Sequence, residues 1–228
     1  MKPNRLCILG AGGHGKVILE IAELSGRYDE IVFFDDDPEV IQCGTAPVVG
    51  NSYDFFNLRE DECDVFIAIG NCSLRSKLTN MLGDVHMPSL IHPAAVVSKT
   101  AEIGRGMVVM AGAIINPSAR IGDGCIINSN AVVEHDCMVG NFSHVSVSAC
   151  LAGSVHVGES CFVGAGATVI NNISICPRCT ICAGAVVVKD ITVSGIYVGV
   201  PSLVESVWEG GINKFHVQPF LHNMREVV

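Results

Sequence analysis

The sequence predicts a Rossmann-like α/β domain at the N-terminus, followed by a parallel β-helix whose short strands coil around one narrow core. From Val97 to Val193 a large aliphatic residue occupies every sixth position, and a small residue usually stands two positions before it. A fixed short period of this kind is typical of a β-solenoid. The α/β domain is indicated by a glycine-rich turn, Gly10–Gly15, between a predicted strand and a predicted helix.

The six-residue period fits the walls of a triangular prism. Each unit forms one short extended wall, and its two inward side chains fill the middle of the prism and the space near a corner. Three walls make a coil of about 18 residues, and coils stack roughly 4.8 Å apart, so residues 97–193 make about five coils. The strands of a β-sandwich would instead show polar alternation with turn signals about every 8–12 residues.

The composition excludes several classes of partner. The chain has 228 residues, enough for two modest domains, and a formal net charge of −9, which disfavours nucleic acid and anionic membranes. No apolar run approaches the ~20 residues that span a bilayer, and the N-terminus does not resemble a signal peptide. Eleven cysteines without a secretory signal indicate free thiols, so we expect a cytoplasmic protein with neither nucleic acid nor membrane as partner.

The cysteines Cys176, Cys179 and Cys182 form a C-x-x-C-x-x-C sequence that resembles a metal motif. The six-residue frame argues against a metal, because Cys176 and Cys182 fall on neighbouring walls and are separated by a wall length. Cys179 falls in the inward small register, 18 residues after Cys161. We therefore expect these two to stack as small buried apolar side chains, and we expect no metal site.

The region before the hexads reads as a βαβ unit with further elements. We expect strands at 5–9, 30–34, 47–50 and 64–69, and helices from the glycine-rich turn to about 25, at 51–57 and at 73–82. The predicted organisation is an α/β domain over 1–90, a β-helix over 91–201 and a C-terminal tail over 202–228. Residues 202–209 are compatible with a helix, and the role of the tail is not readable.

The glycine-rich turn fits the G-x-G-x-x-G pattern of nucleotide-binding folds. Glycines let the backbone approach a phosphate closely, and a helix N-terminus favours its negative charge. An acidic residue at the end of the second strand, in the Asp35-Asp36 pair, suits a ribose or base contact. A dinucleotide is disfavoured, because no domain suited to hydride transfer follows. A nucleotide-linked ligand is favoured, and a purely structural turn stays open.

Chemistry is indicated by Glu134-His135-Asp136, an acid-histidine-acid triplet on an otherwise uncharged wall. A histidine beside a carboxylate is suited to act as a general base, because the carboxylate fixes its tautomer and stabilises the imidazolium. The alternative is that these three side chains are solvated at the surface and have no catalytic role. A zinc site of His135, His144 and His156 is disfavoured, because their positions in the 18-residue coil place them on different walls.

These stretches together resemble the PglD/NeuD group of sugar acetyltransferases, within the hexapeptide-repeat acyltransferases. The resemblance is carried by 10–15, 34–36, 66–71, 127–128, 133–137, 142–147 and 198–201. It implies a left-handed β-helix and a homotrimer that binds acetyl-CoA between neighbouring prisms.

The resemblance also implies roles for single residues. The general base maps to His135, with Asp136 as its acidic partner and Glu134 beside it. The nucleotide-sugar side maps to Gly12, Gly13, His14, Asp35, Asp36, Gly70 and the adjacent Asn71, with Asn128 near the sugar. Acetyl-CoA contacts map to His144 and to the backbone of Gly153, Ala165 and Ala183. Two departures from the family are Ala183, where a glycine is usual, and the longer tail.

We therefore predict an acetyl-CoA-dependent N-acetyltransferase that acts on the amine, at C4, of a nucleotide-linked amino sugar, without a metal. A UDP-linked acceptor is favoured, and a GDP-linked one stays open because the paired aspartates do not choose between the bases. The alternatives are an O-acetyltransferase of a sialic-acid-type sugar and a non-catalytic nucleotide-sugar sensor. The sugar, its stereochemistry and the pathway are not encoded in residues that can be interpreted.

Overall fold

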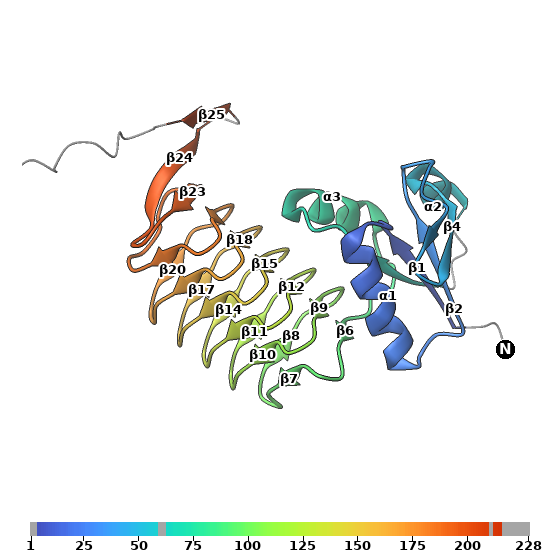
Figure 1. The fold of residues 1–228 in the computed structure, drawn as a ribbon, viewed down its shortest axis with the longest axis horizontal. Coiled ribbons are helices and arrows are strands. Elements are labelled where there is room, and N and C mark those ends of the chain that lie inside the picture. The colour runs from blue at the N-terminus through green and yellow to red at the C-terminus, as the bar shows by residue number, and fades with distance from the viewer. Residues whose placement is uncertain (1–3, 59–62, 210–211, 216–228) are drawn as a thin grey trace, which may run out of the picture.

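The chain folds into an α/β domain seated on one end of a three-walled parallel β-helix (Figure 1). The computed structural model describes residues 4–58, 63–209 and 212–215. Both predicted parts of the fold class are present.

The α/β domain has a five-stranded sheet of order β3-β4-β2-β1-β5, parallel except for β3. Its elements are β1 (Arg5–Leu9), α1 (Gly13–Ser25), β2 (Glu30–Phe34), β3 (Gln42–Cys43), β4 (Ala46–Gly50), α2 (Ser52–Leu58), β5 (Asp64–Ile67) and α3 (Cys72–Leu82). Alternate residues of β1 face opposite sides, because side chains alternate along a strand. Ile8 packs in the same apolar cluster as Ile18 of α1, and Leu9 packs with Phe55 of α2. The predicted strands and helices of this domain lie at or within a few residues of their expected places.

The β-helix has three walls, which the chain visits in turn. The first wall holds β6 (Leu90–Ile91), β9 (Val108–Val109), β12 (Ile126–Ile127), β15 (His144–Val145), β18 (Phe162–Val163), β21 (Thr180–Ile181) and β23 (Gly195–Val198). The second holds β7 (Val96–Val97), β10 (Ile114–Ile115), β13 (Val132–Val133), β16 (Cys150–Leu151), β19 (Thr168–Val169) and β22 (Val186–Val187). The third holds β8 (Glu102–Ile103), β11 (Arg120–Ile121), β14 (Met138–Val139), β17 (His156–Val157) and β20 (Ser174–Ile175).

Stacked residues stand 18 apart, as the period predicts: Val109 pairs with Ile127, and Ile127 with Val145. The inward aliphatic and small residues form one continuous core along the prism. At the corners a residue with positive φ recurs every sixth position from Gly106 to Gly184. The sharp turn between walls requires this left-handed conformation, which explains why many of these positions hold glycine, asparagine or aspartate.

The last coil departs from the prediction. Ile175 pairs with Ile191 and Ile181 with Tyr197, so this coil is 16 residues long rather than 18. Ile191 is therefore buried, whereas Val193, predicted to point inward, is 52% exposed. The period breaks here because no further coil has to be matched in register.

The expected helix at 202–209 is wrong, because this segment forms β24 (Leu203–Glu209), antiparallel to β23 and followed by β25 (Ile212–Phe215). The end of the first wall offers unpaired backbone groups, and an added strand satisfies them. The remainder of the predicted tail, 216–228, lies outside the described residues.

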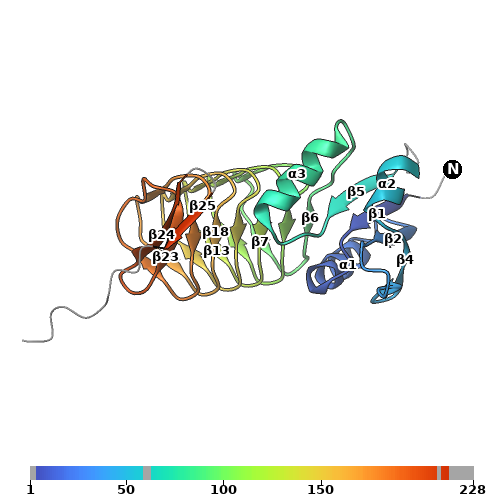
Figure 2. The same cartoon turned by 90° about the horizontal axis from the view of Figure 1, so that it is seen from above.

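The α/β domain is joined to the first wall through a shared apolar core. Leu90, Val108 and Ile126 point outward from this wall and are buried in one cluster with Ile18 of α1. Helix α3 lies over the turns beside this wall, as the second view shows (Figure 2). The sheet edge that carries the glycine-rich turn is thereby held near the prism.

Candidate functional site

The carboxyl ends of β1, β2 and β5 bring together the glycine-rich turn, Asp35 and Gly70. The carboxylate of Asp35 accepts the Ala11 amide N–H at 2.6 Å and so fixes the turn. Gly12 and Gly13 are exposed, and a Cβ on either would meet nothing within 4 Å. The first turn of α1 has no side-chain cap and no acidic residue. Its amide groups and the positive end of its dipole are therefore available to an anion.

Two other predicted residues of this edge accept backbone N–H groups at the starts of helices. Asp36 accepts the Ser52 N–H at 2.8 Å at the start of α2. Hydrogen bonds from the backbone and the side chain of Ser52 lower the pKa of the Asp36 carboxyl. Asn71 accepts the Leu74 N–H at 2.8 Å and caps α3. Both side chains therefore satisfy N–H groups that the first turn of a helix leaves without a backbone partner.

His14, Asn128 and His144 gather where this edge meets the first wall. His144 is 8% exposed, and its ring packs edge-on against Phe162. The Nε2 atom of the ring lies 3.0 Å from the amide nitrogen of Asn128. His144 Nδ1 and His14 Nε2 are buried and have no hydrogen-bond partner among the described residues.

Burial lowers the pKa of His14 and of His144 to about 4, and the nearby charge of Arg75 acts in the same direction on both. For His144 the Gly70 carbonyl has the opposite, smaller effect. The two imidazoles are therefore neutral near pH 7, which leaves ring nitrogens able to accept or donate a hydrogen bond.

His135 lies elsewhere, at the corner between the second and third walls. Its Nδ1 is 2.8 Å from Asp136 Oδ2, and both side chains are 59% exposed. The Glu134 carboxylate accepts the His135 backbone N–H at 3.3 Å. A Cβ on Gly153, one coil further, would lie 2.7 Å from Cε1 and Nε2 of the ring. The imidazole is thus oriented by Asp136 and rests over a glycine that leaves room for it.

Ala165 and Ala183 lie exposed on successive coils at a third place, the corner between the first and second walls. The Gly184 N–H donates to the Ala165 carbonyl, which links the two coils. One chain therefore brings the glycine-rich turn together with Asn128 and His144. It keeps them apart from His135, Asp136 and Gly153, which lie at the corner between the second and third walls.

The buried cysteines of the β-helix follow its six-residue period. Cys161 and Cys179 are buried in the prism core, as predicted, and Cys176 Sγ lies 3.5 Å from Cys179 Sγ. Within the described residues no group of three or more His, Cys, Asp or Glu is arranged to hold a metal ion. None of the eleven cysteines, all of which lie in the described residues, forms a disulfide.

One charged residue of this region, Arg75, was not predicted from the sequence. Its side chain is only 2% exposed and lies between α3 and the prism. The sequence offers only a weak signal, since an arginine four residues after a helix cap is ordinarily a solvated side chain.

None of the helices in the described residues has the length and apolar character that a membrane span requires.

Comparisons with known families agree with this architecture. Residues 5–82 match the PglD N-terminal domain, and residues 100–135 match the bacterial transferase hexapeptide family. The chain is 40% identical over 112 residues to a UDP-N-acetylbacillosamine N-acetyltransferase of Bacillus subtilis (strain 168). That match covers 47% of this chain and 52% of the relative, so it spans about half the length of the curated enzyme.

Solved structures match over a greater length. The acetyltransferase domain of PglB from Neisseria gonorrhoeae superposes with a TM-score of 0.86 at 38% identity, over 88% of this chain and 99% of that one. PerB from Caulobacter crescentus, in complex with CoA and GDP-perosamine, superposes with a TM-score of 0.82 at 40% identity, over 88% and 97%. The fold is therefore the left-handed β-helix that the resemblance implied. The chain belongs to the PglD-type family of hexapeptide-repeat sugar acetyltransferases.

Proposed function

We propose that the protein transfers the acetyl group of acetyl-CoA to the C4 amine of a nucleotide-linked amino sugar. The observation that carries the proposal is the largely exposed His135 ring, which Asp136 orients through Nδ1 and whose Nε2 lies beside Gly153. Such a ring can accept a proton from an attacking amine. The relatives support the class of substrate, because they are named for amino-sugar N-acetylation or hold CoA with GDP-perosamine.

In the proposed reaction the amine nitrogen attacks the thioester carbonyl, and His135 Nε2 takes the proton that the nitrogen loses. A new C–N bond forms, the C–S bond breaks, and CoA leaves as a thiol once the proton is returned to sulfur. Asp136 holds the Nδ1–H and stabilises the imidazolium. The Gly153 amide N–H, which has no acceptor among the described residues, is suited to stabilise the developing oxyanion.

We assign the acceptor to residues 1–90 and the donor and the chemistry to residues 91–201. Gly12, Gly13 and His14 at the start of α1 would hold the diphosphate, with Asp35, Asp36, Gly70 and Asn71 around it. The uncapped helix N-terminus and the open space over the two glycines support this assignment. Asn128 would lie near the sugar, and His144, Gly153, Ala165 and Ala183 along acetyl-CoA.

We further propose a homotrimer with its sites between subunits. The outward row of the second wall is largely apolar and includes Val96, Ile114, Val132 and Val186, and Val96 is 62% exposed. An apolar row of this length is typical of an interface. His135 and Ala165 flank this wall at its two edges, so packing of second walls would bring them together from different copies. Eleven cysteines that form no disulfide among the described residues are typical of a reducing compartment, and we propose a cytoplasmic location.

The test is CoA release, followed by thiol titration, from purified protein given acetyl-CoA and one acceptor at a time. The acceptors are a UDP-linked 4-amino sugar, a GDP-linked 4-amino sugar and free sialic acid. Release with one nucleotide sugar supports the proposal and identifies the base. Release with sialic acid alone would overturn it in favour of O-acetylation. His135→Ala should lower turnover by about 10²–10⁴-fold, and near wild-type turnover would refute the base assignment.

A further inference from the structure

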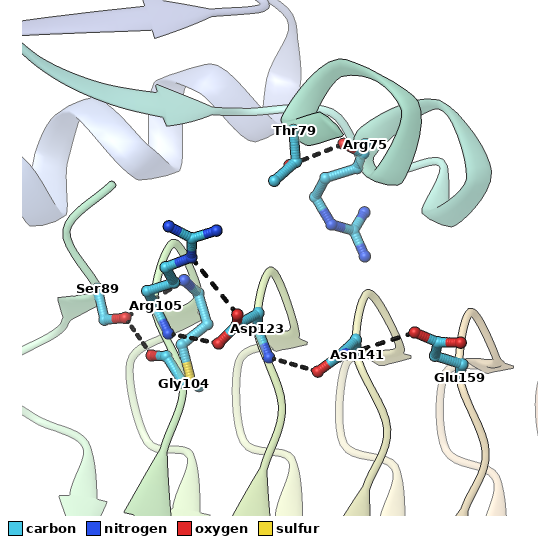
Figure 3. Close-up of polar contacts among 9 residues, drawn as sticks. Arg75, Thr79, Ser89, Gly104, Arg105, Asp123, Asn141 and Glu159 are labelled. Carbon is cyan, nitrogen blue, oxygen red and sulfur yellow. Dashed lines mark hydrogen bonds and ion pairs between the residues drawn. The ribbon is translucent and has the colours of Figure 1, made fainter. Parts of the chain in front are cut away.

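The buried arginine of α3 connects the two domains. Arg75 points from the helix toward the turns between the third and first walls, above the ladder formed by Arg105, Asp123, Asn141 and Glu159 (Figure 3). Its guanidinium is buried but forms no ion pair with a carboxylate among the described residues. A buried charge without a counter-ion is costly unless its hydrogen bonds are satisfied. The hydrogen-bond acceptors of Arg75 therefore indicate its role.

Two of these contacts are to successive coils of the prism. Nε donates to the Gly124 carbonyl at 2.6 Å, and one terminal nitrogen donates to the Phe142 carbonyl at 2.7 Å. Both acceptors are corner residues with positive φ, and their amides, but not their carbonyls, are used in bonds between coils. The planar fork of arginine is suited to bridge two such carbonyls, whereas a lysine ammonium is a single point of donation.

The other contacts are to the acceptor side. The second terminal nitrogen donates to the Ile69 and Gly70 carbonyls at 2.7 and 3.0 Å. These residues form the turn between β5 and α3, at the edge that carries the glycine-rich turn. One side chain thus joins the Gly70 turn to two coils of the prism. Gly124 belongs to the coil that carries Asn128, and Phe142 stands two residues before His144 in the next coil.

We infer that Arg75 is a positioning residue that aligns the nucleotide-sugar edge of the α/β domain with the acetyl-transfer walls of the β-helix. This inference rests on the proposed function. Arg75 touches no reacting atom in this scheme; it acts by holding the Gly70 turn at a fixed distance from His144 and Asn128. Misplacing a bound acceptor by about 1 Å costs on the order of 100-fold in rate.

The experiment compares Arg75→Met, which removes charge and donors, with Arg75→Lys, which keeps the charge but not the fork. Steady-state kinetics use acetyl-CoA and whichever UDP- or GDP-linked 4-amino sugar the unmodified protein acetylates. Arg75→Met should lose about 100-fold in kcat/KM for the acceptor, while the Kd for acetyl-CoA, by calorimetry, changes less than about threefold. Arg75→Lys should lose at least about tenfold. The matched control is Arg105→Met, an exposed arginine at the same corners, which should stay within about twofold.

Rates are expressed per folded molecule, since a purely structural role would lower the melting temperature and leave kcat and KM per folded molecule unchanged. That outcome, or acceptor kinetics within about threefold of the unmodified protein, would overturn the inference. If Arg75→Met does not fold, Arg75→Lys decides by the same criteria.

A readout without substrate separates this inference from the proposed function. Hydrogen exchange of amides in residues 69–75 and 142–144 should accelerate at least about tenfold in Arg75→Met, with no change in residues 155–187. If the unmodified protein acetylates none of the acceptors, the proposed function fails, and unchanged exchange at the junction would independently refute the positioning role.

Discussion

Among single residues, Gly153 is the one whose missing side chain matters most to the proposed base. A methyl group there would lie 2.7 Å from Cε1 and Nε2 of His135, and the ring would have to turn away from Asp136. Gly153→Ala should therefore lower kcat by about 10–100-fold at unchanged melting temperature, because the ring is exposed and free to move. Adding Gly153→Ala to His135→Ala should cost nothing further, as expected for two changes that act through one group. Additive losses in the double variant would contradict this account.

His144 and His14 predict how stability depends on pH. Their pKa values fall from 6.5 in the unfolded chain to about 4 in the fold, because burial disfavours the charged ring. Between pH 6.5 and pH 4 the unfolded chain therefore binds more protons than the folded protein. The free energy of unfolding should therefore not depend on these two rings above pH 6.5. On acidification below pH 6.5 it should fall by up to about 1.4 kcal/mol per pH unit for each histidine.

Urea unfolding at fixed protein concentration, between pH 7 and pH 4.5, measures this slope. His144→Gln should reduce the slope by about one bound proton. An unchanged slope in His144→Gln would show that this ring is not the group that titrates.

At the scale of elements, a column of glycines allows the coils to stack closely. Gly104, Gly122, Gly140 and Gly158 occupy the same place in successive coils, just after the third-wall strands. A Cβ on Gly140 would lie 2.7 Å from the Glu159 nitrogen, and backbone cannot move aside as a flexible side chain can. Gly140→Ala should therefore cost about 1–3 kcal/mol of unfolding free energy.

Thermal or urea unfolding at one protein concentration checks this cost. Gly70→Ala is the stability control, because a Cβ at Gly70 meets nothing within 4 Å. Equal stability of the two variants would mean that the coils can separate to accept the methyl group.

Most elements could be predicted because each hexad buries two side chains in the same way, so local sequence and fold agree. The last coil and β24 could not. Ile191 replaces Val193 in the core because the final coil is two residues short, and Leu203–Glu209 pairs with β23 because that strand offers a free edge. Both depend on where the stack ends, which the repeat does not encode.

For the whole molecule, the coil period predicted which residues share a wall but not which walls meet. His135 and His144 are nine residues apart, half a coil, so the sequence correctly separates them in one prism. What a period of 18 cannot state is which wall of another copy lies opposite. Nor could it predict that Arg75 is buried, because this burial arises only where α3 settles on the prism.

The proposed site between subunits has a direct test in mixed oligomers. His135→Ala removes the base at one edge of the second wall, and His144→Ala removes a donor-side contact near the other edge. Each variant alone should be nearly inactive. If every site takes His135 from one copy and His144 from its neighbour, random mixing of equal amounts regenerates about one quarter of the sites.

Co-expression of the two variants with different tags, tandem purification and CoA-release assays measure the recovered activity. Because the two tags retain only mixed trimers, about one third of the sites in the purified sample should be active. A site built within one chain would give no recovery, because no subunit carries both histidines. Val132→Arg in both variants is the matched control: a charge in the apolar row of the second wall should separate the copies, and the recovery should vanish with the oligomer in light scattering. If the oligomer and the recovery both persist with Val132→Arg, the contact between copies lies somewhere other than the second wall.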